Sequence, residues 1–197
     1  MTEISKYLKS NAANFVSLAA VPFSLAAFYY IDQGQAFLSL VFICISFIID
    51  TLDGQVARKL NIENNQGRII DSFGDMIAYL LFPCFFIYKF LNFNLWVTLA
   101  TCSLIMFFGI WRLSRFTTDG FLVVNGKKYY KGVITPFVLV ATAIFYAARH
   151  HGIQPALYLF HPAMAILSVM MVSNIKLLKT ASWPWYLMAA LLLWITY

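Results

Sequence analysis

Long apolar stretches alternate with short polar segments along the whole chain. A helix needs about 20 apolar residues to cross a bilayer, and six stretches approach that length before a shorter seventh at the end. They cover residues 13–31, 36–49, 69–88, 95–111, 133–148, 156–172 and 184–197. The pattern predicts an all-α integral membrane protein, a polytopic bundle of about six to seven transmembrane helices. Because no linker rich in proline, glycine or serine divides the chain, we expect a single domain over residues 1–197.

The N-terminus adds one element to this prediction. Ile4, Tyr7 and Leu8 recur at helical spacing with lysines between them, which predicts a short interfacial helix on the membrane surface. The first apolar stretch follows Lys6 and Lys9 and is not followed by a small-residue cleavage site. We therefore expect a retained span rather than a removed signal peptide.

The composition agrees with a bilayer environment. Hydrophobic residues make up 61% of the 197 residues and charged residues 11%, and the mean hydropathy is +0.75, far more apolar than a soluble domain. The three cysteines lie inside predicted spans without the spacing of a metal site, so we expect them to pack in the core. They are Cys44, Cys84 and Cys102.

The basic residues predict how the chain is oriented. With the N-terminus inside, 12 of the 14 lysine and arginine residues fall on the cytoplasmic side, all except Lys89 and Arg149. Because basic residues near spans stay in the cytoplasm, we expect a multi-pass protein of the cell membrane with its C-terminus outside. The net charge of +6 is then a property of the cytoplasmic face and suits anionic lipids and substrates. It does not indicate nucleic-acid binding.

Four of the eight acidic residues lie at the cytoplasmic ends of the second and third spans. Asp50 and Asp53 share one face of a helix, and Asp71 and Asp75 share one face of the next, so antiparallel neighbours can point all four inward. A carboxylate inside a membrane helix costs roughly 2.5 kcal/mol or more, which makes it a candidate functional residue. Four converging carboxylates repel one another unless divalent metal supplies positive charge. Oxygen ligands favour magnesium, manganese or calcium, and the pattern fits two-metal phosphoryl chemistry.

Small residues accompany these acids. Gly54 follows Asp53, Ala57 lies one turn further on, and Gly67 begins the facing helix; their missing side chains let a ligand approach the backbone. Arg58 offers a guanidinium group to a phosphate. Close packing of two helices also explains the small residues, but it does not explain four acids. A divalent-cation transporter or channel is another class with carboxylates among its helices, although these acids cluster at one membrane face instead of lining a path.

The residues from Asp50 to Asp75 spell D-x-x-D-G-x-x-A-R-x8-G-x-x-x-D-x-x-x-D. This motif resembles the signature of the CDP-alcohol phosphotransferase family at every fixed position. The resemblance implies an enzyme with a cytoplasm-facing site, in which two divalent cations, Mg²⁺ or Mn²⁺, bridge the pyrophosphate of a CDP-linked lipid and CMP leaves. It also implies a homodimer.

The resemblance assigns roles to residues by position. It implies that Asp50, Asp53 and Asp71 bind metal. It implies that Asp75 is the base that takes the proton of the acceptor hydroxyl and also contacts metal. The set that it implies for the CDP pocket is Asp50, Asp53, Gly54, Ala57, Arg58 and Gly67.

Further segments are similar to the phosphatidylserine synthase branch of this family, among them residues 112–116, 132–136 and 170–176. Arg112 and Arg115, three residues apart at a cytoplasmic helix end, are expected to bind the anionic group of the acceptor, although positive-inside anchoring also explains them. The chain departs from the branch where Ala78-Tyr79-Leu80 replaces Ser-Phe-Gly, and where the first proline of the later turn is missing. The resemblance implies phospholipid biosynthesis, with transfer from CDP-diacylglycerol to L-serine. Inositol phosphate, glycerol phosphate and choline are the alternative acceptors.

Overall fold

The computed structural model describes residues 12–60, 65–91, 93–178, 190, 194 and 196. The side chains of residues 12–17, 53–60, 65 and 66 are outside this description. The interfacial helix expected around Ile4, Tyr7 and Leu8 lies outside the described residues, as does most of the expected seventh span. Both therefore stay predictions.

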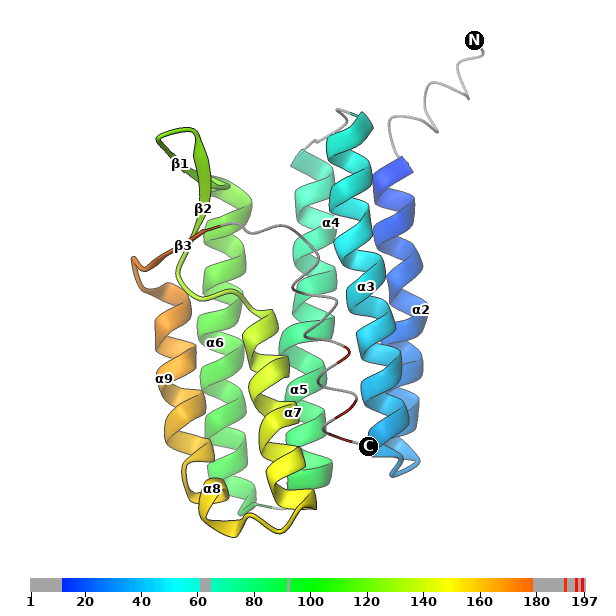
Figure 1. The fold of residues 1–197 in the computed structure, drawn as a ribbon, viewed down its shortest axis with the longest axis vertical. Helices are drawn as coiled ribbons and strands as arrows, with labels where there is room; N and C mark the ends of the chain where they lie inside the picture. The colour runs from blue at the N-terminus through cyan, green and yellow to red at the C-terminus, as the bar shows by residue number, and fades with distance from the viewer. Residues whose placement is uncertain are drawn as a thin grey trace.

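Helices that run along the long axis of the molecule dominate the described residues (Figure 1). The third long helix runs without a gap through α4, η1, α5 and η2. Its winding changes along the way, because η1 and η2 are π-helical. The helical elements are α2 (Ala12–Asp32), α3 (Ala36–Leu60), α4 (Asn65–Met76), η1 (Ile77–Leu81), α5 (Phe82–Phe86), η2 (Ile87–Leu91), α6 (Leu95–Asp119), α7 (Pro136–His150), α8 (Gln154–Tyr158) and α9 (Phe160–Val172).

The first six predicted apolar stretches overlap these helices, and the sixth is divided between α8 and α9. Among the described residues, the helices Gly67–Leu91 and Leu95–Asp119 are long and apolar enough to cross a membrane. The other apolar helices are shorter, and they are Leu18–Asp32, Ala36–Leu52, Pro136–His150 and Phe160–Val172. The prediction of a helical bundle suited to a membrane is confirmed in this coarse form, while the number of spans stays a prediction.

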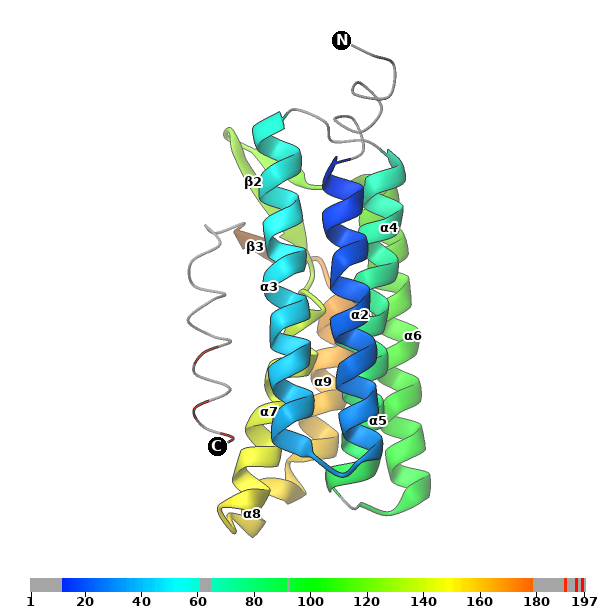
Figure 2. The same cartoon turned by 90° about the vertical axis from the view of Figure 1, so that its right-hand side faces the viewer.

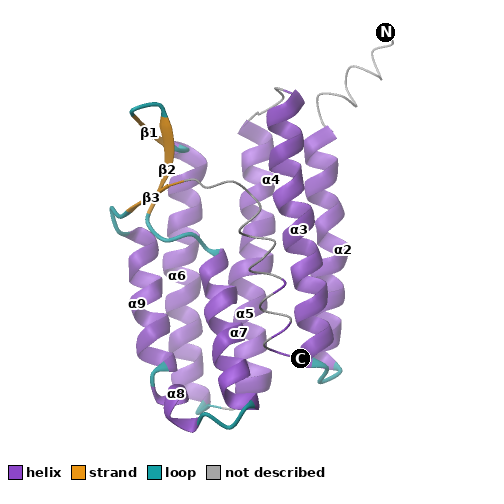
Figure 3. Cartoon of the chain, in the orientation of Figure 1, coloured by secondary structure: helices purple, strands orange, loops and turns teal. Residues whose placement is uncertain are grey.

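A small antiparallel sheet lies at one end of the bundle, beside the C-terminal end of α6 (Figure 3). Strand β1 (Leu122–Val124) pairs with β2 (Lys127–Lys131), which pairs with β3 (Lys176–Leu178). The residues between β1 and β2, Asn125 and Gly126, have φ angles of 50° and 74°, as a two-residue hairpin turn requires. The expectation of an all-α chain is therefore wrong for this segment.

Buried apolar side chains form two clusters that hold the helices together. One cluster joins α2 and α3 to α5 and α7, and includes Phe82 and Phe86, both fully buried. The other joins η1 and η2 to α6, α7 and α9. Turned by 90°, the bundle has α2 and α3 side by side along its length (Figure 2). The hydroxyls of Ser24 and Ser46 share a buried hydrogen bond of 2.7 Å between these two helices, so packing fixes their register.

Gly109 allows α6 to approach η1 closely. A Cβ atom at this position would lie 2.5 and 2.6 Å from the two methyl carbons of Leu80, whose side chain is fully buried. Because overpacking a buried contact costs about 1–3 kcal/mol, we expect Gly109→Ala to lower the thermal unfolding midpoint in detergent by several degrees. In a Leu80→Ala background the same change should have a much smaller effect. An equal effect in both backgrounds would contradict the steric explanation.

Candidate active site

Three of the four predicted acids, one on α3 and two on α4, lie close together. One carboxylate oxygen from each of Asp50, Asp71 and Asp75 lies within 4.8 Å of the other two, and all three side chains are half-buried. Asp71 and Asp75 are one turn apart on α4 and so share a face. Gly74 lies beside the facing acid, since a Cβ there would be at an ordinary contact distance, 3.9 Å, from Oδ1 of Asp50. We call these three residues the carboxylate cluster.

The remaining residues of the motif are on the same two helices. Asp53, Gly54, Ala57 and Arg58 belong to the last turns of α3, where side chains are outside the described part of the structure. Gly67 lies in the first turn of α4. Their expected roles in binding metal and CDP stay predictions.

Tyr79, in η1, holds one acid of the carboxylate cluster in place. Its hydroxyl donates a hydrogen bond of 3.0 Å to Oδ2 of Asp50, and its side chain is 1% exposed. A hydrogen bond of this kind orients a metal-ligating carboxylate. The sequence analysis noted Tyr79 only as a departure from a pattern and did not predict this contact.

Arg112 and Thr135 approach the cluster from the opposite side of α4. The Thr135 hydroxyl donates to Oδ2 of Asp75 at 3.4 Å and accepts from Nη1 of Arg112 at 3.5 Å. Nη1 of Arg112 is 4.0 Å from the same Asp75 oxygen. Arg112 is 4% exposed, and within the described part of the chain its Nε has no hydrogen-bond partner. Since a buried N–H group is costly without a partner, this guanidinium is suited to a further anionic ligand.

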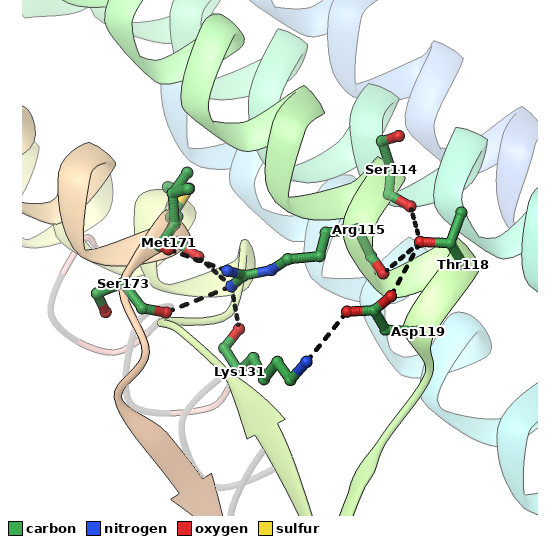
Figure 4. A network of polar contacts seen from close by, with 8 residues as sticks. Ser114, Arg115, Thr118, Asp119, Lys131, Met171 and Ser173 are labelled. Carbon is green, nitrogen blue, oxygen red and sulfur yellow. Dashed lines mark hydrogen bonds and ion pairs between the residues drawn. The ribbon is translucent and has the colours of Figure 1, made fainter.

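Arg115 makes different contacts, although it is only one turn away on α6. Its guanidinium donates to the backbone carbonyl oxygens of Val172 and Lys131, each at 3.0 Å. It is also 3.3 and 3.4 Å from the carbonyl oxygens of Ser173 and Met171 (Figure 4). Arg115 therefore ties the end of α9 and the end of β2 to α6.

Gly132 also contributes to the connection between β2 and the end of α9. It has a φ angle of 76°, and a Cβ there would collide with the carbonyl oxygen of Met171. Its N–H donates to the carbonyl of Ile175 at 2.7 Å, and the N–H of Val133 donates to Met170 at 3.1 Å. Residues 132–135 are thus fixed against the end of α9, and this fixes where Thr135 meets Asp75.

The donor set of the cluster fits a hard divalent cation. Three carboxylates this close repel one another, and such a cation removes the repulsion. Carboxylate oxygens are the ligands that magnesium, manganese and calcium take. The arrangement therefore joins a site for divalent metal to a buried guanidinium through one shared acid, Asp75.

Comparisons with known proteins agree with this geometry. Residues 10–196 match the family described as CDP-alcohol phosphatidyltransferase. A CDP-diacylglycerol–serine O-phosphatidyltransferase of Helicobacter pylori is 27% identical over 169 residues, which is 83% of this chain and 70% of that protein. An archaetidylserine synthase of Methanothermobacter thermautotrophicus is 28% identical over 147 residues, which is 73% and 59% of the two chains. A CDP-diacylglycerol–serine O-phosphatidyltransferase of Methanocaldococcus jannaschii is 32% identical over 139 residues, or 70% and 62%.

The family match covers nearly the whole chain, including both helices that supply the carboxylate cluster. It agrees with the resemblance inferred from the motif between Asp50 and Asp75. The chain belongs to the CDP-alcohol phosphatidyltransferase family. It is a mostly helical transferase whose apolar helices suit a membrane.

Proposed function

We propose that this protein makes phosphatidylserine, by transferring the phosphatidyl group of CDP-diacylglycerol to the hydroxyl of L-serine and releasing CMP. The observation that carries the proposal is the position of Asp75, which is both part of the carboxylate cluster and 4.0 Å from the buried Arg112 guanidinium. The serine-specific names of the relatives in Helicobacter pylori and Methanocaldococcus jannaschii support the same acceptor.

The donor side of the site is proposed to depend on metal. Two divalent cations, Mg²⁺ or Mn²⁺, would neutralise the pyrophosphate and stabilise the attacking and leaving oxygens. The residues proposed to hold them are Asp50, Asp53, Asp71 and Asp75. The CDP group is proposed to lie against the same helix ends, at Gly54, Ala57, Arg58 and Gly67.

Asp75 is proposed to act as the general base. The acceptor oxygen forms a bond to the phosphorus that carries the lipid, while the bond from this phosphorus to the bridging oxygen breaks and CMP leaves with that oxygen. The proton of the acceptor hydroxyl passes to the Asp75 carboxylate. Thr135, 3.4 Å away, orients this carboxylate, since a positioned base is effective only within hydrogen-bond reach of the proton.

Arg112 is proposed to bind the carboxylate of serine. A guanidinium group binds carboxylate through two parallel hydrogen bonds, and the Nε of Arg112 is available among the described residues. In serine, the hydroxyl and the carboxylate are on neighbouring carbons, so one molecule can contact Asp75 and Arg112 together. The contacts of Arg115 support a positioning role on this acceptor side instead of direct contact.

The protein is further proposed to be a multi-pass membrane homodimer whose active site faces the cytoplasm. The sheet at one end of the bundle (Figure 1) carries several lysines, which suit a cytoplasmic surface. They are Lys127, Lys128 and Lys131 in β2 and Lys176 in β3. Light scattering of the solubilised protein tests the dimer, and accessibility of single cysteines placed in the hairpin turn tests the orientation.

Metal binding is the first prediction. Asp71→Asn should weaken Mn²⁺ binding by more than about tenfold, because it removes one ligand, and Tyr79→Phe should weaken it severalfold by freeing Asp50. Titration with Mn²⁺, followed by electron paramagnetic resonance, measures the affinity of each variant and does not require turnover. Asp119→Asn is the matched control, since Asp119 pairs with Lys131 at 3.1 Å on the surface. Normal Mn²⁺ affinity in Asp71→Asn would reject the metal site.

The second prediction tests Asp75 as the general base. Asp75→Asn should keep binding CDP-diacylglycerol but lose turnover by a factor of about 100 or more, because the amide cannot take the proton. Thr135→Val should give a smaller loss of kcat, since the base remains but is less well oriented. CMP release measures both variants. Near-normal turnover in Asp75→Asn with any acceptor would show that the base is a different group.

The third prediction concerns the acceptor. Arg112→Lys should raise the KM for serine roughly 10–100-fold, as expected when a charged hydrogen-bond pair is lost, while the KM for CDP-diacylglycerol stays the same. Arg115→Lys should lower the thermal unfolding midpoint more than it changes the KM for serine.

Ethanolamine, which is serine without its carboxylate, provides the chemical control for this test. The wild-type protein should strongly prefer serine, and Arg112→Lys should lose most of that preference. Inositol phosphate, glycerol phosphate and choline complete the panel. If the wild type releases CMP no faster with serine than with these alcohols, the proposed acceptor is wrong, but the proposal of phosphatidyl transfer still stands.

A further inference from the structure

Aromatic rings lie against the guanidinium of Arg112, and the mechanism proposed above gives them no role. The central carbon of this guanidinium lies over the ring of Phe116, 5.4 Å from its centroid, and over the ring of Tyr130 at 6.0 Å. Tyr130 in turn packs against Phe121, with 5.0 Å between the two ring centroids. We call Phe116, Phe121 and Tyr130 the aromatic cluster. Two of its three rings therefore face a buried cation.

The aromatic cluster is assembled from a helix end and a strand. Phe116 is in the last turns of α6. Gly120 ends this helix with a φ angle of 66°, which favours glycine, and its N–H donates to the carbonyl oxygen of Phe116 at 2.9 Å. Phe121 then packs edge-on against Phe116, with 5.1 Å between centroids. Tyr130 comes from β2, where its register partner is Leu177 of β3. The small sheet thus brings the third ring to α6.

The polar contacts of Arg112 are long for so buried a cation. Its Nη1 is 3.5 Å from the Thr135 hydroxyl and 4.0 Å from Oδ2 of Asp75. By contrast, Arg115 has four carbonyl oxygens between 3.0 and 3.4 Å from its guanidinium. Because hydrogen bonds weaken with distance, polar contacts hold Arg112 less firmly than Arg115. The rings of Phe116 and Tyr130 supply the closest additional support in the described structure.

An aromatic face suits a guanidinium that must also bind a ligand. It attracts a cation, most strongly where water is excluded, and Arg112 is 4% exposed. A ring is nevertheless only a weak hydrogen-bond acceptor. It therefore holds the charge without taking up the N–H groups that a carboxylate ligand needs. A carboxylate or carbonyl group in the same place would compete with that ligand.

Strand β2 contacts both arginines of α6 through consecutive residues. The ring of Tyr130 lies over Arg112, and the carbonyl oxygen of Lys131 accepts a hydrogen bond of 3.0 Å from Arg115 (Figure 4). The chain then continues to Thr135, which contacts both Arg112 and the proposed base. The sheet is thus connected to the acceptor side of the site through a ring as well as through the backbone.

On the basis of the proposed function, we propose that Tyr130 is a positioning residue for the acceptor. Together with Phe116, it holds the Arg112 guanidinium in the orientation that two parallel hydrogen bonds to a carboxylate require. Tyr130 acts through Arg112 and does not itself contact the acceptor. An alcohol that carries a carboxylate gains from this arrangement, whereas an alcohol without one does not. Tyr130 therefore contributes to the preference for serine over ethanolamine.

Two substitutions of Tyr130 test the role of its ring. In nanodiscs with Mg²⁺, Tyr130→Leu should raise the KM for serine about 3–10-fold, as expected when a cation–ring contact is lost. The KM for CDP-diacylglycerol and the KM for ethanolamine should stay the same. Tyr130→Phe keeps the ring and should stay within about twofold of the wild type. An equal rise for serine and ethanolamine, or an equal effect of the two substitutions, would overturn the proposal.

Tyr129→Leu is the matched control. Tyr129 precedes Tyr130 on β2 and is also half-buried, but successive residues of a strand point to opposite faces. Its register partners are Leu122 and Leu178. Tyr129→Leu should leave the KM for serine unchanged, so a rise as large as that in Tyr130→Leu would reveal a general effect on the sheet and overturn the proposal.

A double-mutant cycle separates positioning of Arg112 from simple packing. If Tyr130 acts through Arg112, Tyr130→Leu should lower kcat/KM for serine in the wild type but have little further effect in an Arg112→Gln background. A loss of the same size in both backgrounds would show that the ring acts independently of the guanidinium, which contradicts the proposal.

Nuclear magnetic resonance of protein labelled with ¹⁵N-arginine gives a readout that does not require turnover. The Nε–H signal of Arg112, identified by its absence in Arg112→Lys, should be shifted by the ring currents of the neighbouring aromatic residues. Tyr130→Leu should move this signal, and Tyr129→Leu should not. An unmoved signal in Tyr130→Leu would overturn the proposal. If the signal moves as expected but the wild type does not transfer to serine, the proposed function fails while the contact between Tyr130 and Arg112 stands.

Discussion

The repulsion among three carboxylates held within 4.8 Å of one another is the constraint on which the rest of the site depends. Apolar helices have no reason to bring Asp50, Asp71 and Asp75 together unless a positive ligand joins them. The surrounding structure holds this unfavourable arrangement in place. The Tyr79 hydroxyl fixes one carboxylate through a hydrogen bond of 3.0 Å. The bundle thus holds a cluster of acids whose oxygen ligands fit a divalent cation.

Helix α4 is central because it separates two different environments. On one side its residues line an apolar cavity together with α2 and α3, and on the other it meets α6 and the segment before α7. A lipid and a small polar alcohol need such different surroundings, yet they must meet at one phosphorus atom. Asp71 faces the first environment and Asp75 contacts the second, and they are one helical turn apart. The spacing of the motif therefore gives each of these two acids different surroundings although they lie on the same helix.

The sequence predicted the apolar helices and the closeness of three of the four acids, because both depend on local pattern. Hydropathy locates a span without knowledge of its neighbours, and two pairs of acids at helical spacing share faces wherever the helices pack. The hairpin was not predicted, even though Asn125-Gly126 between short strands is a strong turn signal. The contacts of Thr135 and Tyr79 with the acids were not predictable in the same way. They join residues 60 and 29 positions apart, and only the packing of the helices decides such pairs.

Arg112 and Arg115 illustrate a limit of spacing arguments. Residues three apart on a helix lie on one side of it, so both guanidinium groups were expected to bind the same anionic group. In the structure Arg112 is buried beside Asp75, while Arg115 meets the backbone at the end of α9. A helix end leaves carbonyl oxygens without intrahelical partners, and a nearby guanidinium satisfies them. Of the pair, Arg112 thus lies beside Asp75, whereas Arg115 secures the segment that carries Thr135.

Ala78-Tyr79-Leu80, where the chain departs from the Ser-Phe-Gly of the phosphatidylserine synthase branch, now has a physical explanation that bears on the choice of acceptor. Tyr79 donates its hydroxyl hydrogen bond to Asp50, and Leu80 fills the space that Gly109 leaves on α6. Neither residue hydrogen-bonds to Thr135 or Arg112 in the described structure. The departure therefore changes the metal side of the site and a helix contact, and leaves the contacts around Asp75 and Arg112 in place. For this reason, the different residues at these three positions do not argue against serine as the acceptor.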